Sequence, residues 1–149
     1  MINIRKAILT DEDGLFGLFQ QFPSRQVPGA KSYDTPAARR LFRELVNDES
    51  NGTVFVAEDG GNLLGVVTLS YTYAIRCGGK YSSIEEFVVG SQARGKGVGS
   101  KLLKAAIDEA NKQGCCEVHV ASPSELGYPV YISQNIKDVG RHLALKLRE

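Results

Sequence analysis

The spacing of apolar residues predicts alternating strands and helices along the chain. Apolar and polar residues alternate from Ile2 onwards, which is typical of a strand. Thr10 precedes three acidic residues and an apolar face with helical spacing that ends at Pro23, and Thr35 followed by Pro36 marks the start of a second helix. The same pattern predicts further strands at 54–58, 63–74, 82–89, 117–121 and 139–147 and a helix at 97–113, while 123–136 fits a helix less clearly.

This order of elements predicts an α+β fold. Turn-forming residues at 59–62 and 77–79 join consecutive strands as hairpins, so we expect a mixed, mostly antiparallel twisted sheet with helices packed on it. The chain of 149 residues contains no internal repeat and no linker-like segment. We therefore expect one domain that spans residues 1–149.

The charge and hydropathy of the chain argue against nucleic acids and membranes as partners. Lys and Arg number 18 against 17 Asp and Glu, so the formal net charge is +1 and there is no basic excess of the kind that binds nucleic acid. No apolar run reaches the length of a membrane-spanning helix, and the N-terminus lacks the pattern of a signal peptide. We expect a cytoplasmic protein that binds neither nucleic acid nor membranes.

The cysteines favour free thiols. Cys77, Cys115 and Cys116 are odd in number and two are adjacent, which does not fit a disulfide framework. His119 and His142 do not have the spacing to the cysteines that zinc sites show. We therefore expect reduced cysteines and no bound metal.

Glycine is enriched at one turn. The chain has 16 glycines, and three of them alternate at Gly95, Gly97 and Gly99, where a strand ends and the best-defined helix begins. Glycine lets the backbone approach a ligand closely, and the first N–H groups of a helix lack internal partners. With Arg94 and Lys96 beside it, this turn predicts a site for a phosphate or pyrophosphate.

Three alternative roles fit the same glycines less well. Gly90 and Gly95 have the spacing of a nucleotide-binding P-loop, but Gly97 stands where that loop has a Ser or Thr for magnesium. A dinucleotide fingerprint would need a glycine at Ser100. A plain tight turn needs neither three alternating glycines nor two flanking cations.

Residues 94–99, with the sequence Arg-Gly-Lys-Gly-Val-Gly, resemble the signature of the GNAT superfamily of acetyl-CoA-dependent N-acetyltransferases. The resemblance extends over 84–103 and, in element order, over nearly the whole chain. It implies a sheet splayed between its fourth and fifth strands, acetyl-CoA as co-substrate, backbone amides at 94–100 on the pyrophosphate and the strand edge at 87–89 on the pantetheine arm. The implied coenzyme-binding residues are Phe87, Val88, Val89, Arg94, Gly95, Lys96, Gly97, Val98, Gly99 and Ser100.

The same resemblance suggests groups for the chemistry. Tyr131 occupies the place of a tyrosine that many family members carry after the fifth strand, and it would protonate the departing thiolate, with Tyr128 as the alternative. The amide of Val88 or Val89 would polarise the thioester carbonyl.

The general base is expected on the fourth strand. Glu85 and Glu86 are adjacent there, so strand alternation predicts that they face opposite sides. Glu85 would share the face of Phe87 and Val89 and is the first choice, with Glu86 second and His119 a weaker candidate. The base of the family's histone-acetylating branch falls on Ser83, which cannot serve in that role.

The resulting hypothesis is an N-acetyltransferase that moves acetyl from acetyl-CoA to a primary amine of a small molecule or peptide, by direct attack in a ternary complex. The alternative is a non-catalytic module that binds coenzyme A as a sensor or scaffold, and a phosphate-loop enzyme is a third hypothesis. The segments 23–34 and 71–81 are expected on the acceptor side. A homodimer is left open.

Overall fold

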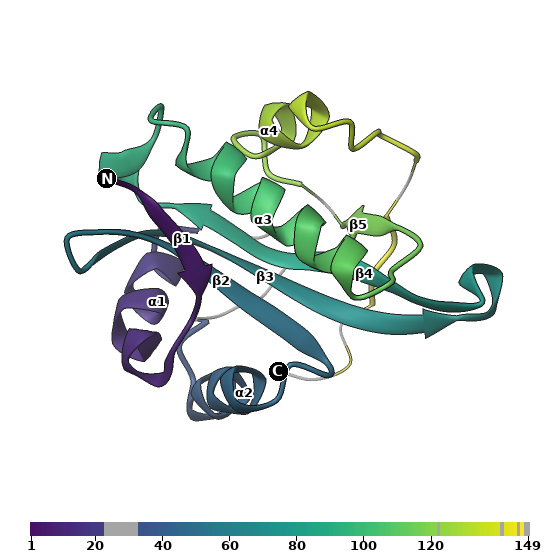
Figure 1. Cartoon of the computed structure of the whole chain (residues 1–149), viewed down its shortest axis with the longest axis horizontal. Coiled ribbons are helices and arrows are strands. Elements are labelled where there is room, and N and C mark those ends of the chain that lie inside the picture. Colours follow the sequence, from purple (N-terminus) through teal and green to yellow (C-terminus); the bar gives the residue numbers. More distant parts are fainter. Residues whose placement is uncertain (23–32, 122, 141, 146, 148–149) are drawn as a thin grey trace.

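The computed structural model describes residues 1–22, 33–121, 123–140, 142–145 and 147 (Figure 1). Its strands are β1 (Asn3–Lys6), β2 (Gly52–Asp59), β3 (Asn62–Ala74), β4 (Gly79–Val89) and β5 (Val118–Val120). Its helices are α1 (Glu12–Phe19), α2 (Pro36–Asn47), α3 (Val98–Lys112) and α4 (Tyr128–Ser133). Within the described part of the chain, none of them is long and apolar enough to cross a membrane.

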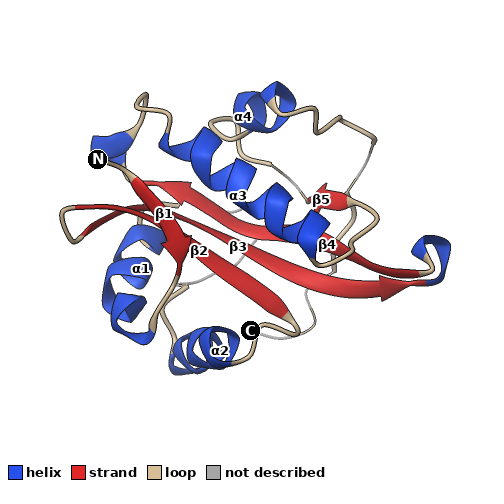
Figure 2. Cartoon of the chain, in the orientation of Figure 1, coloured by secondary structure: helices blue, strands red, loops and turns tan. Residues whose placement is uncertain are grey.

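The five strands form one sheet in the order β1-β2-β3-β4-β5 (Figure 2). The first three pairings are antiparallel, and β5 pairs parallel to β4 after the α3 crossover. Short turns join β2 to β3 and β3 to β4, whereas α1 and α2 lie in the chain between β1 and β2. The expected α+β class with a mixed, mostly antiparallel sheet is confirmed.

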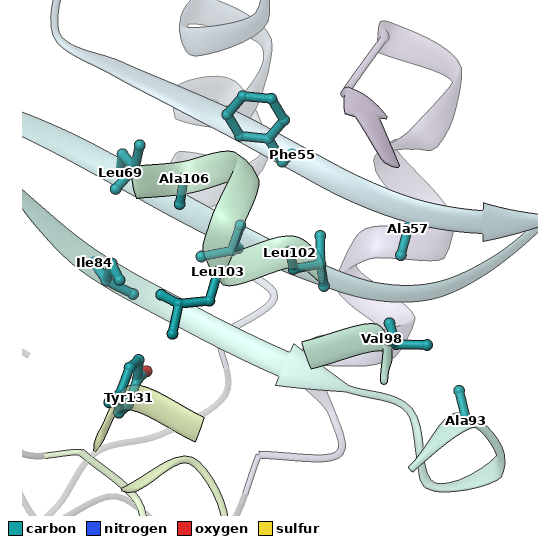
Figure 3. Packing of buried hydrophobic residues seen from close by; sticks show 11 residues of the cluster. Phe55, Ala57, Leu69, Ile84, Ala93, Val98, Leu102, Leu103, Ala106 and Tyr131 are labelled. Atoms are coloured by element: carbon teal, nitrogen blue, oxygen red, sulfur yellow. The ribbon is translucent and has the colours of Figure 1, made fainter. Parts of the chain in front are cut away.

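Helices cover both faces of the sheet because side chains along a strand point alternately to the two sides. Val54, Val56 and Val66 pack against α1 and α2, while the neighbouring residues of β2 and β3 face α3. Figure 3 shows Leu102, Leu103 and Ala106 of α3 lying over the strands, with Tyr131 at the edge of the same cluster. The alternating apolar pattern thus builds two cores, one on each face.

A bulge in β4 changes which residues share a face. Val67 pairs with Phe87 and Leu69 pairs with Ile84, so Glu85 and Glu86 together stand opposite the single residue Thr68. Ile84 therefore lies on the α3 face with Phe87 and Val89, although simple alternation assigns it to the other side. The bulge determines where both glutamates point.

The strand expected at 139–147 is wrong. No described residue of that segment belongs to a strand, and Val139, Leu143, Leu145 and Leu147 are all more than 80% exposed. An alternating pattern makes a strand only where a neighbour supplies hydrogen bonds and a core covers the apolar side. Neither condition is met here within the described residues.

The expectation of three free thiols is also wrong. Cys77 and Cys116 form a disulfide with their Cα atoms 5.8 Å apart, and Cys115 is free. The turn before β4 and the segment before β5 are 39 residues apart in sequence. They meet because the two strands run parallel, which cysteine spacing alone does not reveal.

Candidate functional site

A cavity of about 480 Å³ opens where β4 and β5 separate. The two strands pair only from Ser82 with Val118 to Ile84 with Val120, and β4 then continues to Val89 without that partner. The walls come from β4, the turn before α3 and its first residues, the end of β5 with the segment after it, α4, and the residues just after α1. The lining residues include Ile84, Glu85, Phe87, Val88, Val89, Arg94, Gly95, Gly97, Val98, Gly99, Ser100, Val120, Ala121 and Tyr131.

Two of the three alternating glycines are needed for their backbone conformation. Gly95 and Gly97 have φ angles of 78° and 79°, in the left-handed region, and a Cβ added to either would meet nothing within 4 Å. Gly97 is also the residue that caps the N-terminus of α3. These glycines therefore turn the chain sharply into the helix and leave the space above its first turn open.

Gly99 has a different role, in packing. A Cβ at this position would lie 3.3 Å from Cζ of Phe87 and 3.5 Å from Cγ2 of Val89. The lack of a side chain lets the first turn of α3 sit close against the end of β4. Gly95 and Gly97 thus allow the turn, whereas Gly99 allows the contact between the strand and the helix.

The start of α3 is suited to an anion. The helix has 15 residues, its first N–H groups point out of the N-terminus, and the aligned peptide dipoles add positive potential there. Arg94 is exposed at this end and donates from Nε to the carbonyl of Val89 at 3.2 Å. Lys96 is exposed as well but does not line the cavity.

The unpaired edge of β4 presents backbone groups to the cavity. The amide of Gly90 donates to Leu64 and that of Glu86 donates to Thr68, so both point toward β3. Because N–H groups alternate sides along a strand, those of Phe87 and Val89 point the other way, to the free edge. The cavity is therefore lined by N–H donors as well as apolar side chains.

Tyr131 is held in the cavity wall by α4. Its side chain is buried and its ring lies 5.4 Å from that of Phe87. Gly127 lets the Tyr131 ring lie close to the backbone at the start of α4, since a Cβ at position 127 would lie 3.2 Å from that ring. Tyr128 is exposed, donates toward Asp138 at 3.5 Å, and is not part of the wall.

Glu85 and Glu86 lie on the same face of the sheet, so the expectation that they face opposite sides is wrong. Ser70 donates to Glu85 at 2.6 Å, and Thr68 donates to Glu86. Both partners lie on β3 and face away from α3, because residues two apart on a strand share a face. The extra residue in β4 lets two consecutive glutamates reach that same face. Only Glu85 of the two lines the cavity.

His119 lies outside the cavity wall. Its ring is 4.9 Å from that of Tyr81 and its Nε2 is 2.5 Å from Oε2 of Glu117. This hydrogen bond, together with the nearby Arg76, lowers the pKa of the Glu117 carboxyl despite some opposing desolvation. The arrangement is a surface hydrogen bond at the start of β5, beside an ion pair between Arg76 and Glu117.

Five further residues line the cavity that no sequence pattern indicated. Gln21 and Phe22, just after α1, and Pro123, Ser124 and Leu126 all line it. None belongs to a motif, so only the fold brings them to the site. Of the segments expected on the acceptor side, 23–32 lies outside the described residues, whereas 71–81 forms the end of the β3–β4 hairpin.

One group of side chains has the composition of a metal site. Ligand atoms of Cys77, Cys116 and Glu117 lie within 4.8 Å of one another. Both sulfurs are joined in the disulfide, so they are not available as thiolate ligands in this state.

Acetyltransferase sequences resemble this chain over most of its length. A model of the "Acetyltransferase (GNAT) family" matches residues 16–131. The chain is 33% identical over 94 residues to glucosamine 6-phosphate N-acetyltransferase 1 of rice, a match that covers 60% of this chain and 56% of the rice protein. It spans about half the length of that relative.

Solved structures share the same arrangement of elements. Glucosamine-6-phosphate N-acetyltransferase from Arabidopsis thaliana superposes with a TM-score of 0.81 at 21% identity, covering 99% of each chain. A predicted acetyltransferase from Clostridium acetobutylicum, solved with acetyl-CoA, gives a TM-score of 0.79 at 19% identity and covers 98% of this chain and 96% of its own. These similarities establish the fold.

Proposed function

Because the chain belongs to the GNAT acetyltransferase family, we propose that it transfers an acetyl group from acetyl-CoA to a primary amine by direct attack in a ternary complex. The observation that carries the proposal is the continuous cavity that joins the N-terminus of α3 to the gap between β4 and β5. An anion site and an open strand edge in one cavity fit a ligand with a pyrophosphate at one end and an extended amide arm.

In this proposal the coenzyme is held mainly by backbone groups. The amides of residues 95–100 and the charge of Arg94 bind the pyrophosphate, and the free edge of β4 at Phe87 and Val89 pairs with the pantetheine arm as an added strand would. Of the two amides considered for the thioester carbonyl, strand alternation favours Val89 over Val88. No metal takes part in these contacts.

The chemistry needs one nucleophile, one proton acceptor and one proton donor. The amine nitrogen forms a bond to the carbonyl carbon of the thioester, and the carbon–sulfur bond breaks as the tetrahedral intermediate collapses. Tyr131 gives its hydroxyl proton to the departing thiolate of coenzyme A. The nitrogen of the neutral amine loses one proton as the intermediate collapses, which leaves the amide product neutral and restores the Tyr131 hydroxyl. An amine that arrives in its ammonium form must first lose another proton to a base.

Glu85 is the group best placed to take that proton. It is exposed, it lines the cavity, and its partner Ser70 orients the carboxylate on the face away from α3. The attacking amine is protonated at neutral pH, with a pKa near 10 for a lysine-like group, so a nearby base raises the fraction that can react. Glu86 is bound to Thr68 outside the cavity and serves as the comparison.

The test combines binding with turnover. Isothermal titration with acetyl-CoA and release of free thiol across a panel of amines should both give a signal in the wild-type protein. Glu85→Gln should lower kcat/KM by about 10²-fold near pH 7 and recover toward high pH, where the amine is already neutral, whereas Glu86→Gln should change it little. Absence of acetyl-CoA binding contradicts the proposal, and binding without turnover on any amine indicates the non-catalytic module.

The panel should include amines of the kinds named in similar proteins. One relative is named for glucosamine 6-phosphate, and a structural neighbour with a TM-score of 0.69 is an aminoglycoside acetyltransferase solved with sisomicin. Amino sugars with and without phosphate, together with a lysine-containing peptide, therefore cover the acceptor classes that the hypothesis allows.

A further inference from the structure

A disulfide links two segments at the end of the sheet where β5 begins. Cys77 lies in the turn between β3 and β4, and Cys116 lies between α3 and β5. We propose that Cys77 and Cys116 form a reversible thiol–disulfide site, oxidised by small disulfides and reduced by small thiols, whose state controls how firmly β5 is held against β4. The inference goes beyond the proposed acetyl transfer and does not depend on it.

Both sulfurs of the pair are within reach of small molecules. Cys116 is exposed and Cys77 is half-buried, so a thiol or disulfide the size of glutathione can approach from solvent. The neighbouring Cys115 differs, because burial raises the pKa of its thiol, against weaker opposing effects of Lys80 and Ser82. A thiol with a raised pKa is a poorer nucleophile, which makes Cys115 an internal reference for the other two.

The bond matters for β5 because this strand has few other attachments. Its ladder to β4 runs over three residue pairs, extended by two hydrogen bonds of 3.0 Å, from the amide of Cys116 to Lys80 and from that of Ser82 to Glu117. Each of the other neighbouring strand pairs shares at least four residue pairs. The disulfide adds a covalent restraint at the start of the least attached strand.

The free end of the same strand forms part of the cavity. Val120, the last residue of β5, and Ala121 line the wall opposite β4. Cys116 and Val120 are only four residues apart, so a loss of the restraint at Cys116 can change the position of β5 in the cavity wall. In this proposal the redox state of Cys77 and Cys116 therefore influences the separation of β4 and β5 at the cavity.

The exchange is balanced with glutathione as co-reactant. The thiolate of exposed Cys116 attacks one sulfur of glutathione disulfide, the sulfur–sulfur bond of that molecule breaks, and one glutathione leaves as a thiolate. The thiolate of Cys77 then displaces the second glutathione from the mixed disulfide. Two protein thiols are oxidised, one glutathione disulfide is reduced to two glutathione thiols, and the protons lost by the cysteines are taken up by the products.

The first experiment titrates the full-length protein with mixtures of reduced and oxidised glutathione, followed by alkylation and mass spectrometry. Oxidising mixtures should protect two of the three cysteines, reducing mixtures should expose all three, and peptide mapping should show a Cys77–Cys116 link with Cys115 alkylated throughout. Retention of the bond in a large excess of reduced glutathione would show a permanent disulfide and overturn reversibility. Three alkylated thiols at every ratio would overturn the pair itself.

The second experiment measures amide hydrogen exchange in both states. Reduction should speed exchange at Val118–Val120 by about tenfold or more and leave the middle of α3 unchanged, because β5 loses an attachment and α3 does not. Cys77→Ser and Cys116→Ser should each resemble the reduced wild type in both buffers, while Cys115→Ser should respond as the wild type does. Equal exchange of β5 in the two states of the wild type would overturn the control of β5.

Discussion

At the scale of single residues, the positions of the two glutamates depend on one inserted residue. Strand alternation predicts opposite faces for Glu85 and Glu86, but the bulge opposite Thr68 turns both carboxylates to the side away from α3. The consequence for chemistry is that only Glu85 of the two remains at the cavity. The face of the sheet on which a side chain lies therefore depends on the pairing register with the adjacent strand as well as on the residue's position in the alternation along its own strand.

The buried ring of Tyr131 packs on Phe87 in the cavity wall, and its hydroxyl is the proton donor in our proposal. Tyr131→Phe removes only the hydroxyl and keeps that packing. We expect kcat to fall by about 10²-fold with little change in the KM for acetyl-CoA, because the proton donor acts in the transition state. Steady-state thiol release measures both, and Tyr128→Phe, outside the wall, is the matched control; equal kcat for wild type and Tyr131→Phe would exclude the role.

Asp11 gives a prediction about stability and pH. Its carboxylate is buried and accepts from Nη1 and Nη2 of Arg5 at 2.7 and 3.0 Å and from the amide of Ile8 at 2.8 Å. The hydrogen bond from Arg5 is the largest cause that lowers the pKa of Asp11. Since the pKa is lower in the folded state, the stabilisation is complete above the unfolded value near pH 4 and is lost as the pH falls through the folded value.

Asp11→Asn should therefore lower the free energy of unfolding by about 2 kcal/mol at pH 7, the range for hydrogen bonds to charged groups. The difference between wild type and variant should shrink as the pH is lowered below about 4. Urea unfolding at several pH values measures it, with Asp13→Asn, at an exposed carboxylate, as control. A difference that is constant with pH would show that the carboxylate charge is not the cause.

At the scale of elements, α3 combines a binding terminus with a packing surface. The glycines before and within its first turn separate these tasks, with positive φ at Gly95 and Gly97 and close contact with β4 at Gly99. Sequence patterning located the turn but could not distinguish the two reasons, because a glycine's φ angle and its nearest neighbour appear only in the folded chain.

Gly97→Ala should consequently weaken the binding of coenzyme A, whereas Gly99→Ala should mainly lower the reaction rate. Alanine at position 97 must adopt a φ of 79°, which costs about 1–2 kcal/mol and shifts the amides at the helix start, so coenzyme A should bind more weakly. Alanine at position 99 gains helix propensity but pushes on Phe87, so stability should change by less than about 1 kcal/mol while the rate falls. Thermal unfolding and calorimetry with coenzyme A separate the two, and identical behaviour of both variants would contradict the division.

At the scale of the whole molecule, the cavity exists because the sheet comes apart. β4 pairs with β3 along most of its length but with β5 over only three residues, and the cavity is surrounded by segments from α1 to α4. A ligand that fills it contacts elements that are far apart in sequence. Binding should therefore stabilise the fold as a unit.

Coenzyme A at about 100 times its dissociation constant should add about 2.7 kcal/mol to the free energy of unfolding. For a chain of this size that corresponds to a rise in Tm of about 5–10 °C, which differential scanning fluorimetry detects. Pantetheine, which lacks the pyrophosphate, should give a much smaller rise. Equal shifts with both compounds would place the binding energy away from the start of α3.

The sequence by itself determined the elements and the glycine turn that is suited to an anion. Apolar periodicity located all five strands, α1, α2 and α3, and the alternating glycines marked the start of α3, since these signals depend on residues that are close in the chain. The tertiary structure decided the rest: the bulge at Glu85, the disulfide between Cys77 and Cys116, and the exposure of apolar residues from Val139 to Leu147 where a strand was expected. Each of these depends on which distant segment lies alongside, and pairing between distant segments is set by the packing of the whole sheet rather than by local spacing.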